Sequence, residues 1–423
     1  MRLDNAALIF PAIRNRRWSN AFRVSATLTQ EVDPALLQQA VERIMPRFPS
    51  FYVRLRRGLF WYYLEQIPQP PQVRQDWAYP LTHMGKRETA RCCLRVLYYK
   101  NRIAAEFFHS LTDGTGGIIY LKTLTACYLH LRYGLVIPEA DGILDWTRPP
   151  LHEELEDSFL RCKGPRAVYD REEDAFRLKG TPVHNFLYLT TGLIPTKALL
   201  EAAHSRGTTV TVFLAAVMAQ AILELQQTQT AERQKKPVRI TIPINLRQLY
   251  GSKTLRNFVL TLNPGVDPRL GTYTLEELCV QISSQLKAEA TAQKMAGRIA
   301  ANVEPQENPV LKLAPLSLKT LAMRLVYSRR GESKGCINLS NLGQQRLPAP
   351  MADYVRRLSF VVGTQRSYPN NCSVVSCGDT VCISMIRSIR ESELERRFFS
   401  RLVELGLPVE VESNDPELTK KAE

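Results

Sequence analysis

The sequence has few histidines, no long apolar run and no ordered set of cysteines. Only six of its 423 residues are histidine, so imidazole chemistry is confined to a few positions. No apolar stretch approaches the ~20 residues that cross a bilayer, and the first twenty residues lack the pattern of a secretory signal. The nine cysteines are odd in number and mostly scattered, which argues against a disulfide framework. We therefore expect a cytoplasmic protein with reduced thiols.

Several cofactor and metal motifs are also missing. Neither a phosphate-binding P-loop nor a metal-binding H-E-x-x-H occurs in the chain. The late cysteines form C-x4-C-x4-C without partner histidines, so we interpret them as small buried strand residues. Gly114 and Gly116 begin a dinucleotide-binding pattern, but Ile119 stands where its last glycine belongs. The sequence thus predicts no metal and no permanently bound cofactor.

Basic residues outnumber acidic ones, 56 to 41, which gives a formal charge of +15. Such a charge favours an anionic partner: nucleic acid, an anionic membrane, an acidic protein or a phosphate-bearing small molecule. A solvated basic surface that only aids solubility explains the same value. Nucleic acid ranks lowest, because we find no zinc finger, RNP aromatic motif or basic amphipathic helix, and we predict no nucleic-acid partner. Peripheral contact with a membrane stays open.

The length favours two domains of roughly 150 to 230 residues each. Residues 138–182 are dense in proline, glycine and charged residues, which indicates a change of domain near their end. We therefore expect an N-terminal lobe of residues 1–182 and a C-terminal lobe of residues 183–423. Strand and helix patterns are interleaved in both, which predicts an α/β fold with helices covering sheets.

Local patterns predict the main elements of each lobe. Period-two patterns predict strands at these places: 21–28, a hairpin around 57–58, 92–100, 102–108, and four short runs between 336 and 387. Helical spacing predicts helices at these places: 34–48, 118–133 with a stop at Gly134, 209–227 and 275–301. Beyond about residue 408 the acidic, polar sequence predicts a frayed tail.

The stretch FFHSLTDGTGG, residues 107–117, holds the one histidine in a distinctive setting. His109 follows an apolar strand and precedes a glycine-bearing turn, a place where a side chain projects from a sheet edge into a cleft. A neutral imidazole there takes a proton from a hydroxyl or amine near pH 7. The alternative is a core histidine beside an ordinary turn. Ser110 is no obvious nucleophile, because the chain has no G-x-S-x-G elbow.

Asp113, four residues after His109, has three interpretations. It holds the imidazole, caps the helix that begins near Gly116, or pairs with an arginine to fix the loop. The spacing alone does not choose among them.

At this motif the chain resembles a known superfamily. His109 to Gly114 reads H-x-x-x-D-G, as in the CoA-dependent acyltransferases, which include chloramphenicol acetyltransferase and the condensation domains of non-ribosomal peptide synthesis. Three further segments are similar and follow in the family's order: Pro243–Arg247 as P-x-N-L-R, Asn257–Phe258 as G-N-F with Arg256 in place of the glycine, and Ser340–Gly343 as S-N-x-G. The resemblance covers nearly the whole chain.

Within that superfamily, the chain is most similar to the alcohol acetyltransferase branch. The run FPSFYVRL resembles the entry to that branch's hairpin, with Phe48 in place of a histidine, and SNLGQQRLP resembles its interface strand. The branch is a grouping by sequence, so its label does not establish that the acceptor is a simple alcohol.

The resemblance implies two sublobes of chloramphenicol-acetyltransferase type, each a mostly antiparallel or mixed sheet covered by helices. It also implies a tunnel between them through which donor and acceptor reach His109 from opposite sides. His109 is then the general base and Asp113, followed by Gly114, is a structural brace of the loop that pairs with Arg247. For the developing oxyanion we predict Ser340 and Asn341, at the end of a second-lobe strand, although a simple turn explains the same residues.

Together these features predict a CoA-dependent O- or N-acyltransferase. His109 is expected to deprotonate a hydroxyl or amine of a small-molecule or lipid acceptor as it attacks an acyl thioester, without a covalent acyl-enzyme. Acyl-CoA is the expected co-substrate, and Arg329, Arg330 and Lys334 are one candidate patch for its phosphates. Two alternatives stay open: a stand-alone condensation enzyme that takes its acyl group from an acyl carrier protein, and a non-catalytic binding module of the same fold.

Overall fold

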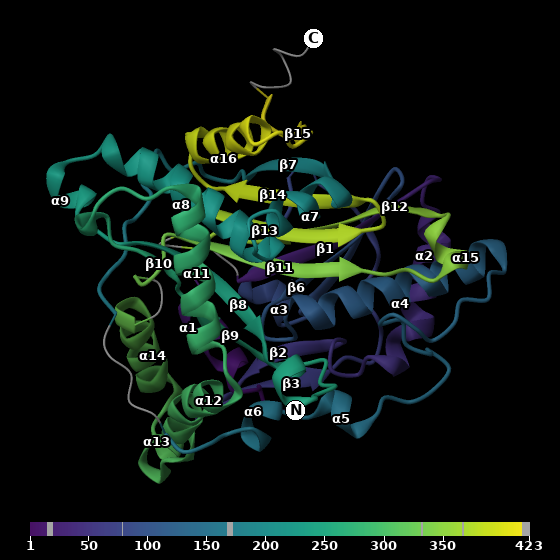
Figure 1. Ribbon diagram of the computed structural model, residues 1–423. Helices are drawn as coiled ribbons and strands as arrows, with labels where there is room; N and C mark the ends of the chain where they lie inside the picture. Colours follow the sequence, from purple (N-terminus) through teal and green to yellow (C-terminus); the bar gives the residue numbers. More distant parts are fainter. Residues whose placement is uncertain (15–19, 78, 167–171, 331–332, 366–367, 417–423) are drawn as a thin grey trace.

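The computed structural model describes residues 1–14, 20–77, 79–166, 172–330, 333–365 and 368–416. The strands form a five-stranded sheet, an eight-stranded sheet and a separate two-stranded hairpin, and helices cover the sheets (Figure 1). The predicted α/β architecture is confirmed. The hairpin predicted around residues 57–58 is also present, as β2 (Val53–Arg57) and β3 (Tyr62–Gln66).

The five-stranded sheet has the order β12-β1-β6-β5-β4. Its strands are β1 (Ala21–Leu28), β4 (Arg74–Gln75), β5 (Leu94–Tyr99), β6 (Arg102–Phe108) and β12 (Val355–Val362). α4 (Gly114–Tyr133) packs on β1 and β6, and α2 (Pro34–Ile44) lies against α4. Because β12 comes from the second half of the chain and pairs antiparallel with β1, the first sheet contains a strand that a division at residue 182 does not anticipate.

The eight-stranded sheet has the order β10-β8-β11-β13-β14-β7-β15, with β9 paired to β8. Its strands are β7 (Tyr188–Pro195), β8 (Val238–Asn245), β9 (Val259–Leu262), β10 (Gly265–Val266), β11 (Ile337–Gln345), β13 (Asn370–Cys377), β14 (Thr380–Arg387) and β15 (Glu410–Ser413). β15 pairs antiparallel with β7, so part of the segment predicted to fray is an edge strand. α8 (Val210–Gln227) packs on β8, between α11 (Leu275–Glu289) and α16 (Glu393–Glu404).

The predicted helix 275–301 is divided in two. The first helix ends with α11, and a second helix, α12 (Ala292–Glu307), begins after two intervening residues. Thr291 caps α12 by accepting a hydrogen bond from the Lys294 N–H. The other helices are short, apart from α14: α1 (Ile9–Ile13), α3 (Lys86–Thr89), α5 (His152–Leu155), α6 (Ser158–Arg161), α7 (Thr196–His204), α9 (Ala231–Gln234), α10 (Leu246–Tyr250), α13 (Pro309–Leu313), α14 (Leu316–Arg330), α15 (Ala349–Ala352) and the 3-10 turns Ala6–Leu8, Met45–Arg47 and Pro268–Leu270.

One helix among the described residues, α8, is long and apolar enough to cross a bilayer. Most of its side chains are buried against the second sheet and its neighbouring helices. A core helix of a folded domain has the same composition, so α8 is accounted for by packing.

Candidate functional site

His109 lies directly after β6, the central strand of the first sheet, at the end of that strand. Its backbone N–H donates to the Asn20 carbonyl at 2.8 Å, which fixes the turn. The imidazole stacks on Phe10 of α1, with ring centroids 4.4 Å apart, and meets the ring of Phe22 of β1 edge-on at 5.1 Å. The ring is therefore held in one orientation by aromatic neighbours, and it lines the large cavity described below.

The amide of Asn257 fixes the tautomer of this imidazole. Asn257 Nδ2 donates to the His109 carbonyl at 3.0 Å and to Asp4 Oδ2 at 3.2 Å, so its Oδ1 faces the ring. That oxygen lies 3.1 Å from His109 Nδ1. Because an amide oxygen only accepts hydrogen bonds, Nδ1 carries the proton and Nε2 keeps its lone pair. The arrangement is the one that a proton-accepting Nε2 requires.

Burial keeps this imidazole neutral. Removal from water penalises the charged form and lowers the pKa of His109 below its ordinary 6.5, although the carboxylate of Asp113 and the bond to Asn257 act in the opposite direction. Burial acts on Asp4 as well and raises the pKa of that carboxyl to about 7. At neutral pH His109 is thus a free base.

Asp113 does not bond to the imidazole but braces the loop in two other ways. Its Oδ1 accepts from the N–H groups of Thr115 and Gly116, at 3.1 and 3.3 Å, and so caps α4. Its Oδ2 accepts from Arg247 Nη1 at 2.9 Å and from the Phe258 N–H at 2.8 Å. Of the three interpretations of Asp113, the structure shows the cap and the arginine pair together.

Arg247 joins three segments that surround the histidine. It follows β8 in α10, and besides its ion pair with Asp113 it donates from Nε to the Thr254 carbonyl at 2.7 Å and from Nη2 to the Arg256 carbonyl. These carbonyls belong to the loop that carries Asn257. Arg247 therefore connects the motif loop, the end of β8 and the segment that orients the imidazole.

The glycines of the motif have a different role from the predicted turn. Gly114, Gly116 and Gly117 are among the first residues of α4, and none has a positive φ. A Cβ on Gly116 would lie 2.5 Å from the Leu255 carbonyl oxygen, and one on Gly114 would lie 2.7 Å from Leu342 Cδ2. These positions lack a side chain because other chain segments approach the helix closely.

Gly116→Ala is expected to destabilise the protein, because the new methyl group meets backbone that cannot yield easily. Overpacking costs about 1–3 kcal/mol, and the helix propensity of alanine offsets at most about 1 kcal/mol of it. We expect the free energy of unfolding in urea to fall by about 1–2 kcal/mol. Gly85→Ala is the matched control, since its nearest atom is 3.8 Å from the added Cβ. Equal stability of the two variants would contradict this role.

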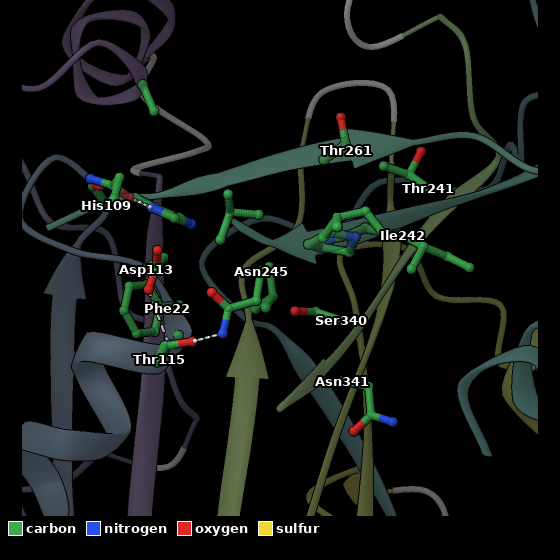
Figure 2. Close-up of a pocket in the computed structure, with 18 of the residues that line it drawn as sticks. Phe22, His109, Asp113, Thr115, Thr241, Ile242, Asn245, Thr261, Ser340 and Asn341 are labelled. Atoms are coloured by element: carbon green, nitrogen blue, oxygen red, sulfur yellow. Dashed lines mark hydrogen bonds between the residues drawn. The ribbon is translucent and has the colours of Figure 1, made fainter. Parts of the chain in front are cut away.

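A cavity of about 810 Å³ lies between the two sheets. Phe22, His109, Asp113 and Thr115 line it from one lobe, and residues of β8, β9 and β11 line it from the other (Figure 2). β11 pairs in parallel with β8 only at Ile337 and Asn338, and the two strands then separate. A hydrogen bond from Asn245 Nδ2 to Thr115 Oγ1, 3.3 Å long, joins the lobes at the cavity wall.

The two residues predicted for the oxyanion, Ser340 and Asn341, differ in their hydrogen bonds. Ser340 points into the cavity, toward the side that carries His109, and its hydroxyl has no partner among the described residues (Figure 2). The amide of Asn341 donates to Thr211 Oγ1 at 2.9 Å and accepts from the Gly343 N–H at 2.8 Å. Both residues lie within β11 rather than at its end, next to a shift of its register against β13. Ser340 is therefore the donor with no other commitment, whereas Asn341, which also lines the cavity, keeps one of its two amide N–H groups.

The basic patch predicted for CoA phosphates is not assembled by the described side chains. Lys334 donates to Asp174 Oδ1 at 2.6 Å and to the Glu172 carbonyl at 2.7 Å, so its charge is already paired. The side chains of Arg329 and Arg330 lie outside the part of the structure that is described.

Solved structures of other proteins share this architecture. TRI101 of F. sporotrichioides, complexed with coenzyme A and T-2, matches with a TM-score of 0.62 and 11% identity over 98% of this chain and 99% of that one. Polyketide synthase associated protein 5 of Mycobacterium tuberculosis matches at 0.59 and 14%, over 95% and 96%. The starter condensation domain of rhizomide synthetase RzmA matches at 0.58 and 12%, over 94% and 92%.

The chain has the fold of the CoA-dependent acyltransferases and condensation domains. No family model and no curated protein sequence matches it. At these low identities the likeness concerns the fold, which the H-x-x-x-D-G resemblance had implied. The cavity beside His109 lies between the two sheets, where the resemblance implied a tunnel.

Sequence reasoning missed three residues of the site. Asn257 was noticed only as part of a family-like segment. Asp4 carries no signal because a lone acid near the start of a chain is unremarkable, and Phe10 carries no signal either. All three depend on contacts over more than 90 positions, which no local pattern reports: Phe10 with His109, His109 with Asn257, and Asn257 with Asp4.

Proposed function

We propose that this protein transfers an acyl group from an acyl thioester, acyl-CoA, to a hydroxyl or amine of an uncharged acceptor. The observation that carries the proposal is the neutral imidazole of His109, whose Nδ1 is committed to Asn257 and whose ring lines the cavity between the lobes. A base that is neutral, oriented and open to a large cavity suits proton removal in acyl transfer. The fold shared with TRI101, which was crystallised with coenzyme A, supports the choice of donor.

In the proposed reaction the acyl group passes directly from donor to acceptor. Nε2 of His109 takes the proton of the acceptor hydroxyl or amine while its oxygen or nitrogen forms a bond to the thioester carbonyl carbon. The C–S bond then breaks, and the proton passes from the imidazolium to the leaving thiolate, which leaves as free thiol. The base returns to its neutral form, so the cycle needs no acyl-enzyme and no metal.

Ser340 is placed to stabilise the charge that develops on the carbonyl oxygen. Its hydroxyl faces the cavity without a partner among the described residues, so it is free to donate to an oxyanion. Asn341 is the weaker candidate for this role, because its amide oxygen and one of its two N–H groups are already bonded to Gly343 and Thr211.

The side chains that line the cavity favour uncharged substrate groups near the reacting atoms. His109 and Asp113 are the only acidic or basic side chains among the described residues that line it, whereas asparagine, glutamine, threonine and serine contribute 14. Asp113 is neutralised by Arg247. Amides and hydroxyls suit the amide-bearing pantetheine arm of the donor, and they offer no countercharge to a carboxylate or phosphate on the acceptor. The phosphates of CoA would then stay at the cavity mouth.

The test is release of free thiol from acetyl-CoA and longer acyl-CoAs with a panel of neutral alcohols, amines and glycolipids and their carboxylated counterparts. We expect turnover with at least one neutral acceptor and little with the charged counterpart. Turnover only with an acyl carrier protein would assign the donor to the carrier's pantetheine arm, which carries the same chemistry. Failure with every donor and acceptor would contradict acyl transfer.

The pH dependence of acyl transfer should follow His109. Burial lowers the pKa of the imidazole below 6.5, so the neutral base predominates at pH 7 and is lost as the pH falls through that lowered pKa. We expect kcat/KM to be level from pH 7 to 8 and to decline along a single limb whose midpoint lies below about 6.5. The measurement is initial-rate kinetics across that range.

A matched variant separates this limb from the titration of Asp4, whose pKa burial raises to about 7. Asp4→Asn removes that carboxyl, which lies on the far side of Asn257 from the imidazole, and keeps an oxygen that can accept from Asn257. The limb should persist below about 6.5 in this variant. A limb that disappears with Asp4 would assign the pH dependence to the carboxyl instead.

Ser340→Ala should slow the chemical step without unfolding the protein. Removing a hydrogen bond to a charged group costs about 1.5–3 kcal/mol, which corresponds to about a 10- to 150-fold lower kcat. KM for the acyl donor should change much less, because the charge exists only in the transition state. Asn341→Ala serves as the neighbouring control, and a larger loss of kcat in that variant would overturn the assignment.

A further inference from the structure

α14 presents an apolar face to solvent. Leu318, Leu321, Leu325 and Val326, here named the α14 stripe, are 60%, 57%, 51% and 56% exposed. Their spacing of three, seven and eight residues places them on one side of a helix, the arrangement that normally faces a core. Leu316 and Lys319 of the same helix are buried, where the helix contacts the β2-β3 hairpin. The helix lies at the edge of the molecule, beside α12 and α13 (Figure 1).

The β2-β3 hairpin extends this apolar surface. The Leu316 N–H donates to the Leu59 carbonyl at 2.9 Å, and Lys319 Nζ donates to the Phe60 carbonyl at 3.1 Å. The same ammonium lies 3.6 Å from the centre of the Trp61 ring. Leu59 is 83% exposed and Phe60 41%, so two elements distant in sequence place large apolar side chains on one surface.

The charged residues of the α14 segment, residues 308–331, have one sign. The segment contains five lysines and arginines and no aspartate or glutamate. Lys312 and Arg57 are exposed, and neither forms an ion pair among the described residues. A surface of leucine, phenylalanine and tryptophan edged by basic residues is typical of segments that lie in the interface of an anionic bilayer. No basic amphipathic helix is predicted from the sequence, because the stripe is recognisable only when its exposure is known.

We propose that the α14 stripe and the tip of the β2-β3 hairpin dock the protein on the surface of an anionic lipid bilayer. A second copy of the chain fits less well, because paired faces would bring the basic residues of two α14 segments together with no acid from either segment. The docking face adjoins the cavity mouth: Tyr327, next to Val326 in α14, lines the cavity, as do Ile9 and Phe10 of α1, which packs on α14. A lipid leaving the bilayer would therefore reach the cavity over a short path.

The test is co-sedimentation with vesicles of phosphatidylcholine alone or mixed with phosphatidylglycerol. We expect the wild type to bind the mixed vesicles, less so as salt is added, and Leu321→Glu with Leu325→Glu to bind at least about tenfold more weakly. Leu270→Glu with Val280→Glu is the control, because those residues are 81% and 63% exposed on other elements. The control should bind like the wild type.

A second variant keeps the test decisive if the glutamates disturb folding. Arg57→Gln with Lys312→Gln leaves the apolar surface intact and should also weaken binding to the mixed vesicles. Absence of binding by the wild type, equal binding to both vesicle types, or unchanged binding by the stripe variant would overturn the proposal. A wild-type dimer in light scattering that the stripe variant dissociates would assign the surface to a second copy. Acyl transfer to a soluble acceptor should be the same in wild type and stripe variant, so the two proposals fail separately.

Discussion

His109→Ala is expected to lower kcat by about 100- to 10,000-fold, the range that a positioned general base contributes. The loss arises because no other side chain among the described residues lining the cavity can take the acceptor's proton: Asp113 is the only other acidic or basic group there, and it is committed to Arg247 and to the cap of α4. The measurement is steady-state thiol release with the best acceptor from the panel.

The residual activity of two variants separates base catalysis from simple packing. His109→Gln keeps a planar polar side chain between Phe10 and Phe22 but has no basic nitrogen, so it should be as inactive as His109→Ala. KM for the acyl donor should change little in either variant, since the base acts on the acceptor's proton. Activity restored by glutamine would mean that the ring only fills space, and the general-base assignment would be wrong.

Arg247→Met is expected to be the most destabilising single substitution of the site. It leaves the carboxylate of Asp113, whose side chain is 4% exposed, without its ion pair. It also removes the donors to the carbonyls of Thr254 and Arg256. Removing one partner of a buried ion pair costs about 3–5 kcal/mol, and we expect a loss of that size in the free energy of unfolding measured in urea.

Two comparisons establish the origin of that loss. Arg269→Met, which removes an exposed arginine from its pairs with Asp267 and Glu173, should leave stability nearly unchanged. Adding Asp113→Asn to Arg247→Met should restore part of the loss, because the neutral amide still caps α4 and no longer needs a countercharge. A loss in Arg247→Met no larger than in Arg269→Met would contradict the buried brace.

The fold and the location of the site could be predicted from the sequence where a pattern was local or where a segment resembled a known family. The strand before His109, the helix stop at Gly134 and the hairpin at residues 57–58 follow from periodicity and turn residues. The alternatives for Asp113 included both contacts that the structure shows, because a carboxylate before a helix can cap it and can pair with a cation.

The features that could not be predicted depend on long-range contacts. Nothing local distinguishes β12, which joins the first sheet, from the strands around it that join the second. β15 looked like a polar tail because its stability comes from pairing with β7 and from an ion pair of Glu412 with Arg357 rather than from apolar residues. Asn341 shares its motif with Ser340, and nothing in the motif indicates that its amide bonds to Thr211, 130 positions away in the sequence.

The most direct test of the account follows both products of one reaction. Wild type and His109→Gln are each incubated with acetyl-CoA and a neutral acceptor, and free CoA, acylated acceptor and the intact mass of the protein are measured together. We predict equal amounts of CoA and acylated acceptor with wild type, an unchanged protein mass, and neither product above background with His109→Gln. Equal turnover by the variant, or an acyl group found on the protein as an intermediate, would contradict direct transfer by His109.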